Sequence, residues 1–204
     1  MDIRSYLGLS AVVPVLTIKA AEDAVPLARA LVAGGLRVLE VTLRTPAALE
    51  AMRRISGEVE GAVVAAGTVL SAGDLDRSAK AGARFGFSPG LAEFMLDEGP
   101  IPILPGIATP SELMRAMGAG LTTFKFFPAV PAGGVGALKA MGGPFPHVAF
   151  CPTGGIDAAN AAQFLALPNV LCVGGSWVAP AKAVEAGDWE TISKLAAGAA
   201  ALRP

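Results

Sequence analysis

The chain has 204 residues, a length typical of one domain. Hydrophobic residues make up 53% and charged residues 16%, which excludes a disordered chain and provides enough apolar side chain for a core. The 16 Lys and Arg residues balance 17 Asp and Glu residues without forming a basic stripe, so we expect no nucleic acid partner. Neither a run of about 18 apolar residues nor a signal-peptide pattern is present, so we expect no membrane partner and a cytoplasmic location.

The cysteines and the single histidine limit the chemistry further. Cys151 and Cys172 are too few for a disulfide framework and lack CxxC spacing, so we expect buried, reduced thiols. His147 is the only histidine, whereas most catalytic zinc sites use two or three. We therefore expect neither a metal-dependent hydrolase nor a zinc aldolase, and a structural role for His147 at the start of a strand.

Short apolar runs rich in β-forming residues alternate with Ala- and Leu-rich segments of helical period along the whole chain. Eight strand-helix units predict an α/β fold, a (β/α)8 TIM barrel, with residues 1–204 as a single domain. An open doubly wound sheet is the alternative, but it normally has fewer strands, and no GxGxxG follows the first strand here. The predicted strands begin near Val12, Val38, Ala62, Arg84, Pro102, Thr122, Val148 and Val170.

Helix signals agree with this order of elements. The segment before Val12 is expected to form a short helix that closes the bottom of the barrel. Asp157 is a candidate N-cap of the seventh helix. A helix over residues 21–33, ended by Gly34 and Gly35, is predicted from one apolar stripe that consists of Ala24, Leu27, Ala28, Leu31 and Val32.

Lys125 is the strongest catalytic candidate, because all strands of a parallel barrel end at the face that carries the active site. Two-residue alternation places Lys125 opposite Phe124 and Phe126, so it points into the barrel if these phenylalanines pack on helices. Burial disfavours an ammonium, and a neutral amine is the form that makes a Schiff base. The alternative is an ammonium that reaches solvent past the strand end. Lys19, the competing amine after the first strand, is interpreted as structural.

Glu40 is a carboxylate inside an apolar strand, which indicates a general acid or base. A salt bridge that merely closes the barrel is the alternative. An ionised Glu40 beside Lys125 would favour the ammonium, so we expect Arg44 to share the charge of Glu40. Arg44 and Thr68 are also candidates for binding a substrate carboxylate, since a guanidinium matches it with two parallel hydrogen bonds; a surface arginine is the alternative for Arg44.

Glycine pairs follow the last two predicted strands, where such barrels often bind phosphate. Either pair alone is a weak signal, and their occurrence at these two strands is stronger. The candidate phosphate-binding residues are Gly154, Gly155, Gly174, Gly175 and Ser176.

Six motifs, in order along nearly the whole chain, closely resemble those of the 2-keto-3-deoxy-6-phosphogluconate (KDPG) and 4-hydroxy-2-oxoglutarate (KHG) aldolases. They are VLEVTLRT at 38–45, AGTVL at 66–70, SPG at 88–90, FKFFPA at 124–129, CPTGGI at 151–156 and GGSW at 174–177. The resemblance implies a Schiff-base aldolase of the Entner–Doudoroff pathway on a (β/α)8 barrel, usually a homotrimer. It implies that this enzyme uses no metal and no cofactor. It also implies cleavage of KDPG to pyruvate and D-glyceraldehyde 3-phosphate, and activity on KHG.

Carried onto this chain, the resemblance makes Lys125 the Schiff-base residue and Glu40 its proton shuttle. It implies that Arg44 and Thr68 hold the carboxylate, and that Pro89 and Phe127 shape the pyruvyl pocket. The glycine loops with Ser176 would then bind the phosphate of a small keto-acid substrate.

Thr153 is the candidate specificity residue of the predicted site. It lies beside Lys125 and just before the glycine pair, at a point where related galactonate-specific aldolases have an apolar residue. We expect its hydroxyl to select the gluconate epimer at C4.

Two other classes of protein would have the same glycine loops for binding phosphate. A phosphate-binding barrel isomerase or epimerase often relies on two carboxylates or on metal-binding His residues, whereas one Glu and no His stand at these strand ends. A non-catalytic phosphosugar-binding barrel would have no use for a costly buried Lys and Glu.

Overall fold

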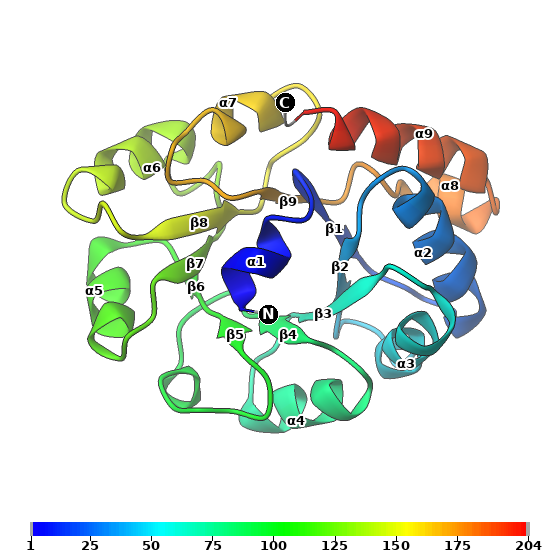
Figure 1. The fold of residues 1–204 in the computed structure, drawn as a ribbon, viewed down its shortest axis with the longest axis horizontal. Helices are drawn as coiled ribbons and strands as arrows, with labels where there is room; N and C mark the ends of the chain where they lie inside the picture. Colours follow the sequence, from blue (N-terminus) through cyan, green and yellow to red (C-terminus); the bar gives the residue numbers. More distant parts are fainter. Residues whose placement is uncertain (1, 203–204) are drawn as a thin grey trace.

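The computed structural model describes residues 2–202 and shows parallel strands curled into a barrel with helices around the outside (Figure 1). Six strands pair in the order β5-β4-β3-β2-β1-β9 and three in the order β6-β7-β8. The strands are β1 (Val12–Leu16), β2 (Val38–Thr42), β3 (Val63–Gly67), β4 (Phe85–Phe87), β5 (Ile103–Leu104), β6 (Gly106–Ile107), β7 (Thr123–Phe126), β8 (Ala149–Pro152) and β9 (Val173–Gly175).

Two junctions close the ring. Strands β5 and β6 are one stretch of chain interrupted at Pro105, which cannot donate a ladder hydrogen bond. Strand β8 meets β9 through parallel bridges from Phe150 to Val170 and from Thr153 to Gly174. The predicted TIM barrel is therefore confirmed, and the predicted strand starts fall within three residues of the observed ones.

Helices follow the strands and cover the outside of the barrel (Figure 1). They are α2 (Ala24–Ala33), α3 (Ala48–Glu58), α4 (Ala72–Lys80), α5 (Pro110–Gly118), α6 (Gly134–Gly142), α7 (Ala161–Leu165), α8 (Ala181–Glu185) and α9 (Trp189–Ala200), with short 3-10 turns η1 (Ala21–Asp23) and η2 (Glu93–Met95). One further helix, α1 (Ile3–Leu7), precedes β1. No helix among these described residues is long and apolar enough to cross a membrane.

The first helix lies across one opening of the ring (Figure 1). Leu7 of α1 is fully buried in a cluster with Val13, Phe85 and Leu104, which come from three different strands. Arg4 fixes the same helix from outside, because its guanidinium donates to the carbonyl oxygens of Thr122 and His147 at 2.9 and 2.7 Å. Helix α1 thus closes the barrel at the end where the strands begin.

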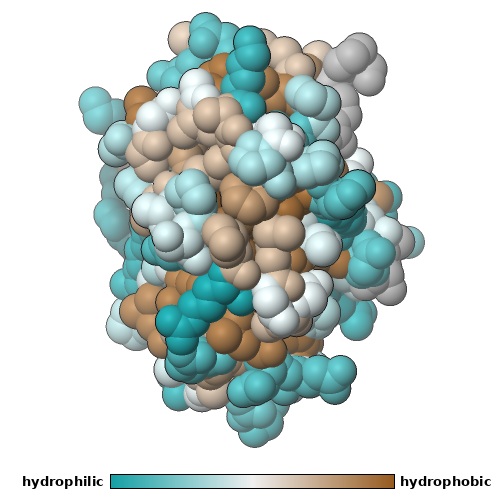
Figure 2. Space-filling model, turned by 90° about the vertical axis from the view of Figure 1, so that its left-hand side faces the viewer, coloured by the Kyte–Doolittle hydropathy of each residue, from teal (hydrophilic) through white to brown (hydrophobic). Residues whose placement is uncertain are grey.

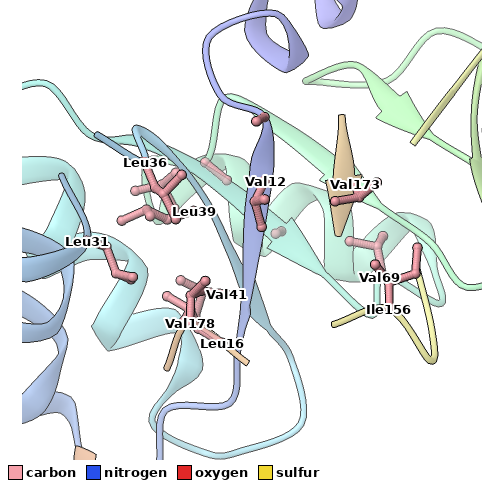
Figure 3. Packing of buried hydrophobic residues seen from close by; sticks show 14 of the residues in the cluster. Val12, Leu16, Leu31, Leu36, Leu39, Val41, Val69, Ile156, Val173 and Val178 are labelled. Carbon is pink, nitrogen blue, oxygen red and sulfur yellow. The ribbon is translucent and has the colours of Figure 1, made fainter. Parts of the chain in front are cut away.

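Alternation along each strand divides the core into two parts. The inner cluster fills the inside of the barrel and includes Val13, Phe85 and Leu104, and the outer layer lies between the strands and the helices. The outer layer packs between strands and helices, and Figure 3 shows part of it, with Leu16 and Val41 next to each other. These two residues are register partners on β1 and β2. Leu31 of α2 belongs to the same buried layer. The outer layer uses the outward-facing positions of the strands. The inward-facing positions near the carboxyl ends of the strands are therefore available for polar groups.

The helix predicted over 21–33 is present, but its first turn is the 3-10 turn η1. Four of its five stripe residues are buried, and Val32 is partly exposed. The Asp157 prediction was wrong in detail, because α7 begins four residues later at Ala161. Asp157 instead accepts hydrogen bonds from the backbone N–H groups of Ala159 and Asn160 within the preceding turn.

Both cysteines are buried, as expected. Cys151 lies on β8, and Cys172 directly precedes β9. They belong to the inner cluster and are both fully buried.

Candidate active site

Lys125 and Glu40 meet inside the barrel. Lys125 lies on β7 and Glu40 on β2, and the Lys125 Nζ donates to the two Glu40 carboxylate oxygens at 2.9 and 3.2 Å. Lys125 is 5% exposed and Glu40 is 1% exposed, so this ion pair is almost fully shielded from water. The geometry lets a proton pass directly between the amine and the carboxylate.

Two phenylalanine rings enclose the Lys125 amine. Its Nζ lies 5.1 Å from the ring centroid of Phe87 and 5.6 Å from that of Phe127. Phe124 and Phe126 are fully buried in the outer layer, as the alternation predicted. Sequence reasoning missed Phe87, although the alternation in the Phe85-Gly86-Phe87 segment could have placed it on the inner face.

Lys19 has a different environment. Its side chain is 72% exposed, and it pairs with Glu185 at 3.0 Å. The Lys19 amine is therefore not buried, and the Glu185 carboxylate with which it pairs is exposed as well.

Arg44 lies at the end of β2, and one part of its prediction was wrong. Its Nε donates to Thr68 Oγ1 at 3.1 Å. Within residues 2–202 it makes no ion pair with Glu40, whose carboxylate is paired with Lys125 instead. The Arg44 side chain is exposed at the strand end, and its guanidinium has further N–H donors for an incoming anion.

Thr68 has an unusual backbone conformation directly after β3. Its φ is 59°, in the left-handed region that β-branched residues rarely adopt. Such a conformation costs free energy and often occurs at functional positions. At Thr68 this backbone conformation occurs together with the hydrogen bond that the Thr68 hydroxyl accepts from the Arg44 guanidinium.

A pocket of about 270 Å³ lies at the carboxyl ends of the strands. It brings together most of the predicted binding residues, namely Arg44, Phe127, Thr153, Gly154, Gly155, Gly174, Gly175 and Ser176. The residues that line this pocket do not include Lys125, Glu40, Thr68 or Pro89. Lys125 is connected to it through the Phe127 ring, and Thr68 through its contact with Arg44.

Two of the four glycines that line the pocket have backbone conformations that other residues tolerate poorly. Gly154 and Gly155 have φ values of 106° and 77°. Left-handed backbone at two successive positions turns the chain sharply and exposes backbone at the pocket wall, where it can approach an anion. Ser176 is exposed at the same wall.

Pro89 lies at the turn after β4 and packs against Gly106 of β6. A Cβ at residue 106 would clash with the Pro89 backbone. This close contact fixes the turn beside β6, the strand that pairs with Lys125 through Gly106.

The Thr153 hydroxyl is unusual among buried polar groups. Thr153 is 6% exposed, and its Oγ1 has no hydrogen-bond partner among the described residues. A buried hydroxyl without a partner is unfavourable by about 1–3 kcal/mol. Because Thr153 lines the pocket, a bound molecule could supply the missing partner.

No group of three or more His, Cys, Asp or Glu side chains within residues 2–202 is placed to hold a metal ion. The polar groups that converge on the site are instead an amine, one carboxylate, a guanidinium and backbone amides.

The Lys125–Glu40 pair is buried inside a parallel barrel, beside a pocket that is lined by a guanidinium, hydroxyl groups and glycine backbone. This arrangement defines a site for Schiff-base chemistry. The family model for KDPG and KHG aldolases matches residues 3–195. The chain belongs to this family.

Individual relatives agree over nearly the full length. The KHG/KDPG aldolase of Escherichia coli (strain K12) is 57% identical over 196 residues, which are 95% of this chain and 92% of that protein. The 2-dehydro-3-deoxy-phosphogluconate aldolase of Pseudoalteromonas atlantica is 57% identical over 193 residues, 93% of this chain and 90% of that protein. Among solved structures, the Legionella pneumophila KDPG aldolase with pyruvate captured as a covalent carbinolamine has a TM-score of 0.95 and 46% identity, covering 98% of both chains.

Proposed function

We propose that this protein is a class I aldolase that cleaves KDPG (2-dehydro-3-deoxy-6-phosphogluconate) to pyruvate and D-glyceraldehyde 3-phosphate through a Schiff base on Lys125. The observation that carries the proposal is the buried contact of the Lys125 amine with both Glu40 oxygens. The same pyruvyl chemistry applies to 4-hydroxy-2-oxoglutarate, in line with the KHG/KDPG name of the E. coli relative.

Glu40 first accepts a proton from the Lys125 ammonium, which yields the neutral amine. The amine attacks the C2 keto carbon, and Glu40 returns the proton to the oxygen of the resulting carbinolamine. Loss of water gives a protonated imine, which withdraws electrons from the C3–C4 bond and so takes the part that a Lewis-acid metal would otherwise play. The two phenylalanine rings keep bulk water away from the amine.

Bond cleavage then requires removal of the proton from the C4 hydroxyl. The C3–C4 electron pair moves into the imine to form an enamine, and glyceraldehyde 3-phosphate leaves. Protonation at C3 and addition of water to the imine release pyruvate and restore Lys125. Glu40 is the only carboxylate within hydrogen-bond distance of the amine among the described residues, so we assign these proton transfers to it.

Substrate binding follows the distribution of charge in the pocket. Arg44 and Thr68 hold the carboxylate, and Pro89 and Phe127 bound the pyruvyl group. The backbone of the two glycine pairs and the Ser176 hydroxyl bind the phosphate. The support for this assignment is that one pocket contains Arg44, Ser176 and both glycine pairs.

Trapping with borohydride tests the proposal. Incubation with pyruvate and borohydride should add a reduced pyruvyl group to the wild-type protein, detectable by intact mass and located on Lys125 by peptide mapping. Lys125→Ala should lose the adduct and cleavage. Lys19→Ala is the matched control, because Lys19 is exposed and should not be needed.

A folded wild-type protein without an adduct would contradict the proposal, as would an adduct on Lys19. An isomerase or a non-catalytic binding barrel gives no adduct. EDTA should leave trapping unchanged, because the imine does not need a metal.

We also propose a homotrimer in the cytoplasm. Met114 and Met117 of α5 are 63% and 38% exposed, and Val130 in the loop after β7 is 44% exposed. Figure 2 shows the side of the molecule that carries α5 and α6, where apolar surface extends over the middle of the face. Association of subunits through this face would cover the exposed methionines of α5. Light scattering of the wild type and of Met114→Asp measures the mass and tests the interface.

A further inference from the structure

Thr17 lies in the candidate active site, although its sequence context assigned it no role. It follows β1 directly, and alternation places it on the same inner side as Val13 and Val15. Its side chain is exposed and lines the same pocket as Arg44 and Ser176. The molecule therefore presents a third hydroxyl to the pocket, in addition to those of Thr153 and Ser176.

The order of the strands places Thr17 between the two ends of the proposed substrate. Strand β1 pairs with β2 on one side and with β9 on the other. Arg44, which we assign to the carboxylate, follows β2, and Ser176, which we assign to the phosphate, follows β9. Thr17 thus faces the middle of a molecule that spans these residues.

Hydrogen bonds behind Thr17 fix the direction of its hydroxyl. Thr42 Oγ1, which is fully buried, donates its hydrogen to the carbonyl oxygen of Leu16 at 2.9 Å. Thr42 has one hydroxyl hydrogen, so the 3.1 Å contact between Thr17 Oγ1 and Thr42 Oγ1 must use the hydrogen of Thr17. The Thr17 oxygen consequently offers only lone pairs to the pocket.

A lone-pair acceptor selects a hydrogen-bond donor. The ionised carboxylate and phosphate oxygens of the proposed substrate are themselves acceptors, so they gain nothing from the Thr17 oxygen. The hydroxyl groups at C4 and C5 are the donors in the middle of the molecule. Thr153 follows the strand that pairs with the Lys125 strand, whereas Thr17 follows β1, which pairs with β2 and β9 and not with the Lys125 strand. The C5 hydroxyl is farther from the carbon that Lys125 attacks than the C4 hydroxyl, so it matches Thr17 better.

We propose that Thr17 is a specificity-determining residue that accepts a hydrogen bond from the C5 hydroxyl of the substrate. This inference rests on the proposed aldolase function. In the condensation direction the C5 hydroxyl originates from the hydroxyl of glyceraldehyde 3-phosphate. An aldehyde without that hydroxyl has no group for Thr17 to bind.

Two phosphorylated aldehydes test the proposal in condensation with pyruvate. D-glyceraldehyde 3-phosphate carries the relevant hydroxyl, and 3-oxopropyl phosphate lacks it but keeps the aldehyde and the phosphate. Thr17→Val removes the acceptor at nearly constant shape and should lower kcat/KM for glyceraldehyde 3-phosphate by about 10-fold, the effect of one lost hydrogen bond. It should leave kcat/KM for 3-oxopropyl phosphate unchanged, and Thr17→Ser should restore the preference.

Thr45→Val is the matched control. Thr45 donates from its hydroxyl to the Ile18 carbonyl oxygen of the same loop but does not line the pocket. This variant should preserve the ratio of kcat/KM for the two aldehydes even if the loop is loosened, and thermal unfolding of all variants measures that loosening.

Equal losses for both aldehydes in Thr17→Val would assign the hydroxyl to the phosphate or to pocket shape and overturn the proposal. No loss for either aldehyde would overturn it as well. A wild-type protein that condenses neither aldehyde would instead overturn the aldolase function, and the role of Thr17 with it.

Discussion

The carboxylate of Glu40 occupies the space in which a side chain of residue 67 would begin. A Cβ on Gly67 would lie 2.5 Å from Glu40 Oε1 and 2.7 Å from Glu40 Cγ, closer than real Cβ contacts. Gly67 is the last residue of β3, and β3 pairs with the Glu40 strand along its whole length. The glycine on the neighbouring strand is therefore what leaves room for the Glu40 carboxylate beside Lys125.

Gly67→Ala should consequently displace Glu40 and lower turnover. The added methyl group has to push away a buried carboxylate, and overpacking of this kind costs about 1–3 kcal/mol of stability. We expect lower kcat together with a reduced unfolding free energy. Gly198→Ala is the control, because a Cβ there meets nothing within 4 Å, and alanine is favoured over glycine at this exposed position of helix α9. Full turnover in Gly67→Ala would show that the Glu40 position is not critical.

Glu40→Gln tests the proposed proton transfers. The substitution keeps the shape and one acceptor oxygen for Lys125 but removes the titrating group. We expect turnover to fall by about 10²- to 10⁴-fold, the usual contribution of general acid–base catalysis. Circular dichroism and urea unfolding check that the barrel persists. Unchanged turnover with a large loss of stability would support the alternative that the ion pair only closes the barrel.

Sequence reasoning worked where one local pattern determines the result. The repeated strand-helix units predicted the barrel, and the alternation of Phe124, Lys125 and Phe126 predicted which side chains face outward. These features depend on neighbours along the chain, so they are visible in the sequence.

Contacts between distant strands were harder to predict. The partner of Glu40 is 85 residues away, and the Arg44 prediction was wrong because Lys125, on a strand that does not pair with β2, reaches this carboxylate across the barrel interior. The proposed role of Thr17 was equally difficult to predict, because the direction of the Thr17 hydroxyl depends on the Thr42 hydroxyl on the next strand. The start of α7 was misplaced because Asp157 forms a turn of its own before the helix begins.

Glu112 predicts a pH dependence of stability that is separate from catalysis. Burial acts to raise the pKa of Glu112, but hydrogen bonds from the Ala108 and Thr109 backbone N–H groups and the Thr109 hydroxyl outweigh it and lower the pKa below its ordinary value of 4.5. The carboxylate is part of a capping box at the start of α5. Its ionised form is therefore favoured by folding, and this contribution to stability is present above about pH 4.5 and is lost as the pH falls through the lower folded pKa.

The measurement is the unfolding free energy of the wild type and of Glu112→Gln across the acidic range. The wild type should be more stable at neutral pH, and the difference should shrink as the pH falls below about 4. Glu60→Gln, at an exposed turn, is the control. A difference between wild type and Glu112→Gln that stays constant with pH would contradict the proposed linkage.

Thr153→Val separates stability from specificity in one substitution. The unpaired Thr153 hydroxyl is held against Gly174, where a Cβ would clash with it, so it cannot easily turn toward another partner. Replacing it with a methyl group removes an unsatisfied buried group, and we expect the unfolding free energy to stay constant or to rise by about 1 kcal/mol. Thr42→Val is the contrast, because it removes a buried hydroxyl that does have a partner and should destabilise the protein.

The same substitution should reduce discrimination between KDPG and its C4 epimer. The two substrates share both ends, so the preference depends on a group near the C4 hydroxyl, and one buried hydrogen bond changes the ratio of kcat/KM by about 10- to 100-fold. We expect the wild type to prefer KDPG and Thr153→Val to weaken or reverse this preference. If kcat/KM for both epimers keeps the same ratio in the two proteins, Thr153 does not read the C4 hydroxyl, and its unpaired oxygen must serve another part of the substrate.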